Sequence, residues 1–372
     1  MKLNIAVLPG DGIGPEVTDQ AIKALKAIAS EFNHNFKFTT ADVGAVAIDK
    51  HNNPLPENTL DLCKSSDAIL FGSIGHPKYD NNPSAKIRPE QGLLKLRKEL
   101  GLFANIRPVK AYETLLEKSP LKKSVIKGTD ISIYRELTGG IYFGEKQLSE
   151  DGNTASDLCV YSSEEIERIA HLAFKAAQAR SHKVTLVDKA NVLESSRLWR
   201  KVVTEISKQY NDVELEFLFV DNAAMQIILN PKQFDVILTE NMFGDIISDE
   251  ASVIGGSIGL LASASVGEKF ALFEPIHGSY PQATGKGIAN PIASVLSAAM
   301  LLDHFELHRE AELIRLAVEK SLKLSITTPD INDQYDYVST TRVGEFIEDF
   351  IFNPKDTNIN FKNIHLGQST II

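Results

Sequence analysis

Two aspartates, Asp245 and Asp249, stand four residues apart in the stretch GDIISDE, on either side of two isoleucines. On a helix, positions four apart lie on one face, so these negative charges would repel each other. A bound Mg²⁺ or Mn²⁺ would convert the repulsion into chelation, because hard cations prefer oxygen ligands. With Asp221 as a third carboxylate, the aspartates indicate a divalent metal site. The alternative is a solvated helix face beside an unrelated loop aspartate.

Cationic and phenolic side chains elsewhere in the chain would suit an anionic substrate. Arg97, Arg107 and Arg135 are candidates to clamp carboxylates, because the guanidinium fork matches a carboxylate in bidentate fashion. Tyr142 and Lys189 are a possible acid and base, since a lysine among other charges can act as a proton relay. Taken singly, each of these residues also fits an ordinary surface role.

Two glycine-rich stretches indicate close approaches of the backbone. The segment HGSYPQATGKGIANP, residues 277–291, is expected to let a ligand come near its backbone, although a plain surface loop is the alternative. The stretch GDGIGPE follows a strand-like run near the amino terminus. The dinucleotide fingerprint needs its third glycine where Pro15 stands, so a tight turn into a helix is the better interpretation.

The hydrophobic pattern predicts a layered α/β scaffold for these side chains. Continuous apolar strands joined through helices predict parallel neighbours that are buried on both faces. In such sheets ligands gather beyond the carboxyl ends of the strands, and Lys189, Asp221 and Asp245 all follow such ends. The expected elements are strands at 4–9 and 67–75, a helix at 15–32, strand-to-helix units at 183–192, 214–224 and 234–245, and hairpin material at 140–147 and 157–162.

Composition places the chain among ordinary globular proteins. Its 372 residues are 43% hydrophobic and 24% charged, which suits two domains or one large α/β unit. The formal net charge of -10 argues against nucleic-acid binding, so an anionic ligand needs locally placed cations. No apolar run is long enough to span a bilayer, and the apolar part of the amino terminus is too short for a signal peptide. With only two cysteines, a cytoplasmic location is expected.

Four motifs together resemble the β-decarboxylating dehydrogenases: YRELTGGIYFG, VDKANVL, NMFGDIISDEAS and FEPIHGSYPQATGKGIANP. The resemblance covers nearly the whole chain and implies an α/β fold that is not Rossmann, with a mixed sheet flanked by helices. One domain would combine residues 1–102 with 256–372 and bind the nucleotide, and residues 103–255 would form the other. The resemblance also implies a homodimer with shared active sites, in which Lys189 and Asp221 reach into the partner's site.

The resemblance assigns the metal to a set of carboxylates. Asp245, Asp249 and the partner's Asp221 would hold Mg²⁺ or Mn²⁺, which would chelate the hydroxyl and adjacent carboxylate of a 2-hydroxy acid. Ile246 and Ile247 would hold the helix against the core while the acids face the cleft.

Catalytic roles also follow from the resemblance. Lys189, through water or Asp221, would take the hydroxyl proton while a hydride passes to NAD. Tyr142 would protonate the enol carbon after carbon dioxide is lost. The departing carboxylate would be held by three arginines, Arg97, Arg107 and Arg135.

The stretch RPEQGLLKLR indicates which substrate the chain takes. Its E-x-x-L-L-x-x-R pattern is similar to that of family members that oxidise (2R,3S)-3-isopropylmalate to 4-methyl-2-oxopentanoate and CO₂ in leucine biosynthesis. The pattern is formed by Glu90, Leu93, Leu94 and Arg97. Two leucines offer an apolar wall to an isopropyl group, whereas a third carboxylate, as in isocitrate, would be costly to bury there. Tartrate/malate or homoisocitrate oxidation are alternatives within the family. A metal-dependent phosphohydrolase and a nucleotide-binding module are alternatives outside it.

The residues that would bind NAD lie mostly in one loop. They are Glu90, His277, Gly278, Ser279, Tyr280, Gln282, Gly285, Lys286, Gly287, Ile288, Ala289, Asn290 and Asp330. The resemblance implies that His277 stacks on the adenine, that Asp330 lies on the adenine side, and that Glu90 lies near the nicotinamide. NAD-using relatives usually carry an aspartate where this chain has Gln282. NAD is therefore expected over NADP, but by a narrower margin than in those relatives.

Overall fold

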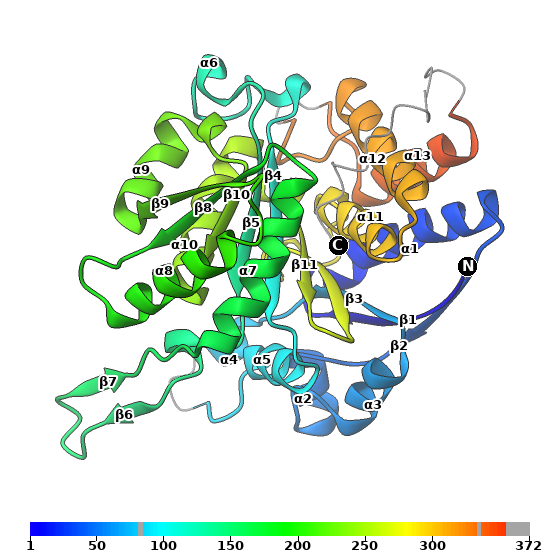
Figure 1. Cartoon of the computed structure of the whole chain (residues 1–372). Coiled ribbons are helices and arrows are strands. Elements are labelled where there is room, and N and C mark those ends of the chain that lie inside the picture. Colours follow the sequence, from blue (N-terminus) through cyan, green and yellow to red (C-terminus); the bar gives the residue numbers. More distant parts are fainter. Residues whose placement is uncertain (81–84, 333–335, 355–372) are drawn as a thin grey trace.

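The central element of the fold is a ten-stranded mixed sheet flanked by helices (Figure 1). The computed structural model describes residues 1–80, 85–332 and 336–354, so residues 355–372 of the expected terminal domain lie outside the described part. The strand order is β2 (Asn35–Thr40), β1 (Lys2–Gly10), β3 (Ala68–Ser73), β12 (Ala271–Pro275), β11 (Ala262–Val266), β4 (Ala104–Lys110), β5 (Asp130–Glu136), β10 (Val236–Thr239), β8 (Lys183–Asp188) and β9 (Glu214–Phe219).

Antiparallel pairing is confined to the middle of the sheet. Strands β2, β1, β3 and β12 pair in parallel, and so do β5, β10, β8 and β9. Strand β11 runs antiparallel to both β12 and β4, and β4 runs antiparallel to β5. This arrangement confirms the predicted mixed sheet and differs from the parallel sheet of a Rossmann domain. The expectation of burial on both faces is wrong for β9, because β9 is the edge strand and none of its residues is fully buried.

Helices cover both faces of this sheet. They are α1 (Gly14–Glu31), α2 (Ala45–His51), α3 (Glu57–Ser65), α4 (Pro77–Asp80), α5 (Pro89–Glu99), α6 (Lys123–Ile126), α7 (Ser163–Gln178), α8 (Glu194–Ser207), α9 (Val220–Leu229), α10 (Asn241–Ser252), α11 (Ile292–His304), α12 (His308–Lys323) and α13 (Thr340–Phe352). In the described part of the chain, no helix combines the length and the apolar character needed to cross a membrane.

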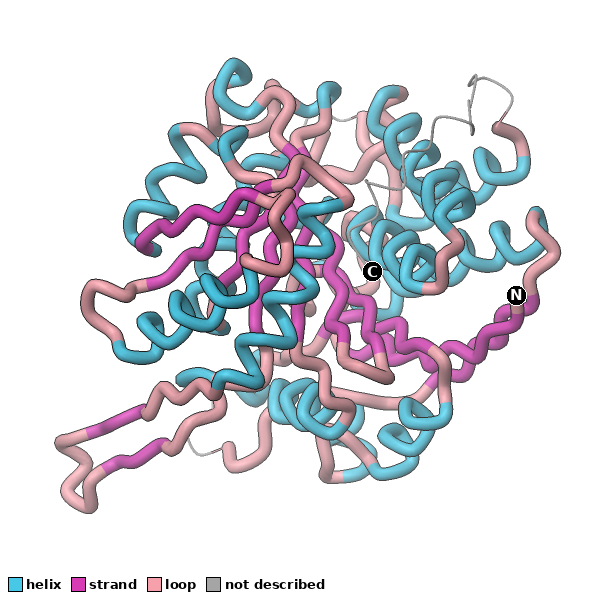
Figure 2. Tube along the Cα trace, in the orientation of Figure 1, coloured by secondary structure: helices cyan, strands magenta, loops and turns pink. Residues whose placement is uncertain are grey.

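The ends of the chain and its middle contribute to different halves of the sheet. Strands β1, β2, β3, β11 and β12 come from the two ends, and β4, β5, β8, β9 and β10 come from the middle. The boundaries near residues 102 and 255 stay a prediction. The middle segment also carries a separate hairpin, β6 (Lys146–Leu148) and β7 (Ala155–Asp157), whose residues are all exposed and which extends away from the rest of the molecule (Figure 2).

One face of the sheet packs on a continuous apolar core, and the other face packs on two separate ones. The continuous core joins strand residues such as Ile5 and Tyr134 to α1, α7, α8, α11, α12 and α13. On the opposite face, one core gathers around α3 and α5, and the other around α9 and α10. We call these the α3–α5 core and the α9–α10 core. The middle strands between them carry polar side chains, so this part of the sheet is where chemistry can be placed.

Candidate active site

The gap between the α3–α5 core and the α9–α10 core holds two buried arginines. Successive strand residues point to opposite faces, so Arg107 of β4 and Arg135 of β5 project from the face that carries Ile133 of the α9–α10 core. Their residues are only 8% and 3% exposed. A buried charge is costly unless it is paired and hydrogen-bonded, and both arginines have such partners.

Arg107 is held by partners on two elements, β4 and α10. Its Nε donates to Asn105 Oδ1 at 2.6 Å, and its Nη1 donates to Ser248 Oγ at 2.6 Å. The same Nη1 donates to Asp249 Oδ1 at 3.2 Å, and Nη2 lies 3.5 Å from Asp245 Oδ1. The guanidinium is therefore fixed by β4 on one side and by α10 on the other.

Arg135, Tyr142 and Asp245 form a second contact group. Arg135 Nη1 donates to Asp245 Oδ1 at 2.5 Å, and the Tyr142 hydroxyl donates to Asp245 Oδ2 at 2.9 Å. Burial, together with the charge of Arg107, lowers the pKa of Arg135 to about 10, so the guanidinium stays charged at neutral pH. Burial and the contact with Asp245 raise the pKa of Tyr142, so its phenol stays protonated and is able to donate a proton.

The helix α10 presents both aspartates to this group, as the spacing predicts. Glu240 caps its first turn, since the Glu240 carboxylate accepts from the Phe243 N–H at 3.0 Å. Ile247 is fully buried in the α9–α10 core, but Ile246 is 58% exposed. The expectation that both isoleucines pack inward is therefore wrong for Ile246. Adjacent residues on a helix point in different directions, so a single core cannot hold both.

The carboxylates of Asp245 and Asp249 suit a hard cation. They are 34% and 62% exposed at the side chain, and carboxylate oxygens are the ligands that Mg²⁺ and Mn²⁺ prefer. Burial raises the pKa of Asp249, Arg107 opposes the shift, and the charge of Asp245 adds to it. Among the described residues of one chain, no group of three or more His, Cys, Asp or Glu side chains is arranged to hold a metal. A single chain therefore offers only part of a donor set here.

Lys189 and Asp221 form a pair of their own. Lys189 follows β8 and Asp221 opens α9, and the Lys189 ammonium contacts the Asp221 carboxylate. This contact lowers the pKa of Asp221. Among the described residues, no hydrogen bond or ion pair joins this pair to Asp245 or Asp249. The structure thus brings the predicted catalytic and metal residues of one chain into two groups.

A cavity of about 160 Å³ opens beside the arginines. Its lining includes Leu93, Arg97, Arg107, Glu274 and His277, so an apolar side chain and two cations face one space. Arg97 Nη2 donates to Glu274 Oε1 at 3.0 Å, and both side chains of this pair are nearly buried. The cavity therefore combines the features that a branched, doubly charged acid requires.

Glu90 and Leu94, the other two residues of the E-x-x-L-L-x-x-R pattern, are not among the residues that line this cavity. Leu94 is 36% exposed and lies outside the lining of the cavity. Glu90 is exposed in the first turn of α5. A Cβ on Gly75 would come within 3.4 Å of Glu90 Oε1 and 3.3 Å of Ser279 Oγ, so Glu90 and the glycine loop border the same small space.

The loop at 277–291 is open where a ligand would approach. A Cβ on its glycines, Gly278, Gly285 and Gly287, would meet nothing within 4 Å among the described residues. Gly285 and Gly287 have φ of +72° and +63°, which favour glycine. The exposed side chains of this loop are those of Tyr280, Gln282, Thr284 and Lys286.

The remaining loop residues hold its shape. His277 Nε2 is buried without a hydrogen-bond partner among the described residues, and burial lowers the pKa of His277, which keeps the ring neutral. Asn290 Nδ2 donates to Asp330 Oδ2 at 2.9 Å, which ties the loop to the segment carrying Asp330. Ile288 and Ala289 pack against the start of α1. His277 Nδ1 donates to the Gly278 carbonyl oxygen at 3.0 Å, so Nε2 of the neutral ring is left as an acceptor, which the exocyclic amino group of an adenine base would suit.

The amino-terminal glycine turn supports this loop. Gly12 has φ of +60°, and a Cβ there would lie 2.0 Å from the Ser279 carbonyl oxygen. The Ile13 N–H donates to that same oxygen at 2.8 Å. Asp11 accepts from the N–H groups of Ala45 at 2.8 Å and Gly75 at 3.0 Å. The interpretation of this stretch as a tight turn rather than a dinucleotide fingerprint is confirmed.

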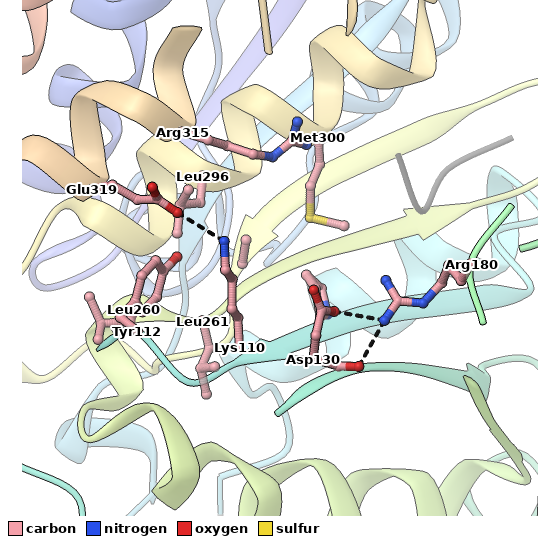
Figure 3. A pocket seen from close by; sticks show the side chains of 12 residues that line it. Lys110, Tyr112, Asp130, Arg180, Leu260, Leu261, Leu296, Met300, Arg315 and Glu319 are labelled. Atoms are coloured by element: carbon pink, nitrogen blue, oxygen red, sulfur yellow. Dashed lines mark hydrogen bonds and ion pairs between the residues drawn. The ribbon is translucent and has the colours of Figure 1, made fainter. Parts of the chain in front are cut away.

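A second cavity, of about 100 Å³, lies on the opposite face of the sheet between β4 and the helices α11 and α12 (Figure 3). Its cations are paired with acids, as Arg97 is in the first cavity: Lys110 Nζ donates to Glu319 Oε1 at 2.9 Å, and Arg180 Nη2 donates to Asp130 Oδ1 at 2.7 Å. None of the residues expected from the sequence to be functional lines it. The arginine face is therefore the better candidate for the active site.

Several polar residues of this site are not among those expected from the sequence. Asn105, Asn241 and Glu274 each bind an arginine of the group. Polar residues inside a strand are a recognisable departure from the apolar pattern, and Asn105 in the run FANIRPV and Glu274 in ALFEP are such departures. That signal identifies them as unusual but does not reveal which arginine each one binds.

Comparison with known proteins places this arrangement in a family. A model of the isocitrate/isopropylmalate dehydrogenase family matches residues 4–347. The chain is 52% identical over 352 residues to the 3-isopropylmalate dehydrogenase of Bacteroides fragilis, covering 94% of this chain and 99% of that protein. It is 53% identical over 354 residues to the enzyme of the same name from Bacillus subtilis, covering 94% and 97%.

Solved structures agree with this placement. An isocitrate dehydrogenase from Methylococcus capsulatus superposes with a TM-score of 0.84 at 34% identity, covering 94% of this chain and 99% of that one. A β-decarboxylating dehydrogenase from Thermococcus kodakarensis superposes with a TM-score of 0.78 at 38% identity, covering 94% and 96%. The mixed sheet, the arginine group and these similarities lead to one conclusion: the chain belongs to the isocitrate/isopropylmalate dehydrogenase family.

Proposed function

We propose that the protein catalyses the NAD-dependent oxidative decarboxylation of 3-isopropylmalate to 4-methyl-2-oxopentanoate and CO₂, a step of leucine biosynthesis. The observation that carries the proposal is that Leu93, Arg97 and Arg107 line one cavity. The arginines suit the two carboxylates of the substrate, and Leu93 suits its isopropyl group. The names of the relatives, which are 3-isopropylmalate dehydrogenases, support the same substrate.

Each group of the site has a role in this reaction. Arg97, Arg107 and Arg135 bind the substrate carboxylates and keep the one that departs as CO₂ in place. The amine form of Lys189, paired with Asp221, would receive the proton of the substrate hydroxyl through water or Asp221. When bound, NAD would accept the hydride, and Mg²⁺ or Mn²⁺ on Asp245, Asp249 and Asp221 of the partner subunit would polarise the new carbonyl.

Tyr142 serves the second half of the reaction. Loss of CO₂ leaves an electron pair on the carbon that carried the carboxylate, and a proton must be added there. The Tyr142 phenol is protonated because its pKa is raised, and it lies beside Asp245. It is therefore placed to give its proton to that carbon.

Two copies of the chain would complete each active site. The separation of the Lys189–Asp221 pair from Asp245 in one chain supports this arrangement, because the reaction needs both groups together. Apolar side chains are exposed on the outer sides of α9 and α10, notably Met225 at 56% and Ile246 at 58%. A helix face of this kind is typical of a surface that a partner covers. We infer that the middle segment, residues 103–255, carries the dimer interface and that the cleft lies between it and the domain formed by residues 1–102 and 256–372.

A substrate panel tests the function. The protein is mixed with NAD, Mg²⁺ and, in separate reactions, 3-isopropylmalate, malate, tartrate, homoisocitrate or isocitrate, and the absorbance of reduced nicotinamide is followed. The highest kcat/KM is expected with 3-isopropylmalate. Formation of reduced nicotinamide with another of these acids alone would assign the chain to a different substrate, and phosphate release from a phosphate ester without nicotinamide reduction would indicate a phosphohydrolase.

Leu93 should set the preference for the branched substrate. In Leu93→Ser, we expect kcat/KM for 3-isopropylmalate to fall by about 10- to 100-fold, because one apolar contact is worth roughly 1–3 kcal/mol. Malate, which lacks the isopropyl group, should be affected far less. Leu94→Ser should have a smaller effect on that ratio, since Leu94 is 36% exposed and is not among the residues that line the cavity. If the ratio of kcat/KM for 3-isopropylmalate and malate is unchanged in both variants, the leucines do not lie in the substrate pocket.

Gln282 should determine how strongly the enzyme prefers NAD over NADP. Gln282 is exposed in the nucleotide loop, and its neighbours Pro281, Ala283 and Thr284 offer no cation to a 2′-phosphate. We expect the wild type to prefer NAD and Gln282→Asp to sharpen the preference by about tenfold, because a carboxylate would repel that phosphate by on the order of 1–2 kcal/mol. The ratio of kcat/KM for the two cofactors measures this.

A charge control accompanies the cofactor experiment. Gln209→Asp adds the same charge at an exposed position outside the loop and should leave the cofactor ratio as it is. A wild type that prefers NADP would refute the cofactor assignment. A Gln282→Asp variant no more selective than Gln209→Asp would show that this side chain does not face the ribose.

A further inference from the structure

A chain of buried polar side chains joins the two arginines of the cavity from beneath. Arg97 Nη2 donates to Glu274 Oε1 at 3.0 Å, and Ser265 Oγ donates to the same oxygen at 3.3 Å. Asn105 Nδ2 donates to Ser265 Oγ at 3.1 Å, and Asn105 Oδ1 accepts from Arg107 Nε at 2.6 Å. The chain therefore crosses three adjacent strands, from β12 through β11 to β4.

The donors and acceptors of this chain fix its direction. Arginine can only donate, so the oxygen of the Asn105 amide must face Arg107. Its nitrogen then faces Ser263 and Ser265, whose hydroxyl oxygens lie 2.7 and 3.1 Å away. Ser265 accepts from that nitrogen and so is free to donate to Glu274. Asn105 and Ser265 are both 0% exposed, which leaves water no access to replace these bonds.

The chain also spans the junction between the two parts of the molecule. Asn105 lies on β4, the first strand of the middle segment, and Ser265 lies opposite it on β11 from the carboxyl-terminal segment. Arg97 comes from α5 and Arg107 from β4, so the two cations of the cavity belong to different parts. These hydrogen-bonded side chains therefore couple the position of Arg97 to that of Arg107.

We propose that Asn105 and Ser265 are positioning residues that set the spacing of Arg97 and Arg107, and with it the geometry in which the carboxylates of the substrate are held. The proposal rests on the proposed function. Arg97 depends strongly on this route, because its Nε is buried without a partner among the described residues and Glu274 is the acid that orients its guanidinium. A tilt of Glu274 would therefore turn Arg97 relative to Arg107.

A matched pair of serine variants tests the proposal. Ser265→Ala removes the hydroxyl that donates to the Glu274 carboxylate. Ser297→Ala removes an equally buried hydroxyl that donates to the backbone carbonyl of the same residue, at 2.8 Å. Each variant loses two buried hydrogen-bond contacts, those of Ser265 with Glu274 and Asn105 or those of Ser297 with the Glu274 and Ala293 carbonyl oxygens, so both should lower Tm to a similar extent. Only Ser265→Ala should change the orientation of the Glu274 side chain.

The kinetic expectation separates positioning from stability. We expect Ser265→Ala to lower kcat/KM for 3-isopropylmalate by about tenfold, mainly through KM, because small misplacements of binding groups are costly. The KM for NAD should change less than about twofold, and Ser297→Ala should keep kcat/KM for the hydroxy acid within about twofold of wild type. Equal losses in the two serine variants, or no loss in Ser265→Ala, would overturn the proposal.

Asn105 provides a second arm with its own conservative replacement. Asn105→Asp keeps an oxygen toward Arg107 Nε, whereas Asn105→Ala removes every contact of the side chain. If the two variants have similar Tm values, kcat/KM for the hydroxy acid should therefore fall further in Asn105→Ala than in Asn105→Asp. An Asp variant as impaired as the Ala variant would contradict the role given to that oxygen. If Asn105→Ala does not fold, the serine pair decides the question.

Failure of the proposed function is distinguishable from failure of this inference. It would appear as a wild type that forms no reduced nicotinamide from 3-isopropylmalate. The same variants would then be compared on the 2-hydroxy acid of the panel that the wild type does oxidise, where the expected difference between Ser265→Ala and Ser297→Ala is the same.

Discussion

Replacing Asp245 with asparagine should lower the turnover of 3-isopropylmalate by about 100-fold or more, while the affinity for NAD stays nearly unchanged. The Asp245 carboxylate contacts Arg135, Tyr142 and Arg107, and an amide would present neither the charge nor two acceptor oxygens to them. The nucleotide loop is a separate segment and should be unaffected. Steady-state kinetics and calorimetric titration with NAD measure the two effects.

Two controls accompany this experiment. Asp19→Asn, at an exposed position on α1, makes the same chemical change away from the site and should keep wild-type turnover. Chelation of divalent cations by EDTA should abolish the activity of the wild type. Equal activity with and without EDTA would refute the assignment of a metal to Asp245 and Asp249.

Mixed dimers extend the prediction to the shared site. Chains carrying Asp245→Asn and chains carrying Lys189→Met are co-expressed with different tags and the mixed species is isolated. If each site takes Lys189 from the other chain, one site of the mixed dimer carries both changes and the other carries none, so activity should return. If each site is built within one chain, both sites are damaged and the mixed species should be as inactive as its parents.

Replacing Tyr142 with phenylalanine should lower kcat by roughly 10²- to 10⁴-fold, the usual contribution of a positioned acid. The loss should fall on the steps after hydride transfer, because only protonation of the product carbon needs the phenol. In a single turnover, reduced nicotinamide should form faster than the decarboxylated product is released. The ring is 38% exposed and phenylalanine keeps its shape, so stability should change little.

Tyr79 offers a matched control for Tyr142. Its hydroxyl donates to Asp49 Oδ1 at 2.8 Å, the same kind of contact that Tyr142 makes with Asp245. Tyr79→Phe should leave both phases of the turnover at wild-type rates. Slower hydride transfer in Tyr142→Phe, with unchanged decarboxylation of a supplied keto acid, would show that the role given to Tyr142 is wrong.

The sequence is sufficient to predict the elements that have a strong pattern of their own. The helix at 15–32 and the parallel units around β8, β9 and β10 follow from apolar periodicity, and the structure confirms them. Strand β11, ASASV, consists mainly of small residues and has no such pattern. Its pairing with β4 joins segments that are distant in the chain, and local periodicity carries no information about such a partner.

The candidate site shows the same limit at the level of side chains. The four-residue spacing predicts that Asp245 and Asp249 share a helix face, and both do contact Arg107. The inward packing expected for Ile246 is wrong because the direction of the core around a helix depends on tertiary contacts. The contact of Asn105 with Ser265 is invisible for another reason: a buried amide in a strand is meaningful only once its neighbours across the sheet are known.

The position of β12 in the sheet has a consequence for the order in which the protein assembles during synthesis. Ile69 of β3 pairs with Leu272 of β12, so the inner edge of the amino-terminal strands has no partner until the ribosome has produced the whole middle segment. At about 5–20 residues per second, that interval lasts on the order of ten seconds or more. The middle segment brings its own strands β4, β5, β8, β9 and β10 and is able to fold during the wait. The apolar edge of β3, all of whose residues are buried in the finished protein, is meanwhile open to pairing with other nascent chains.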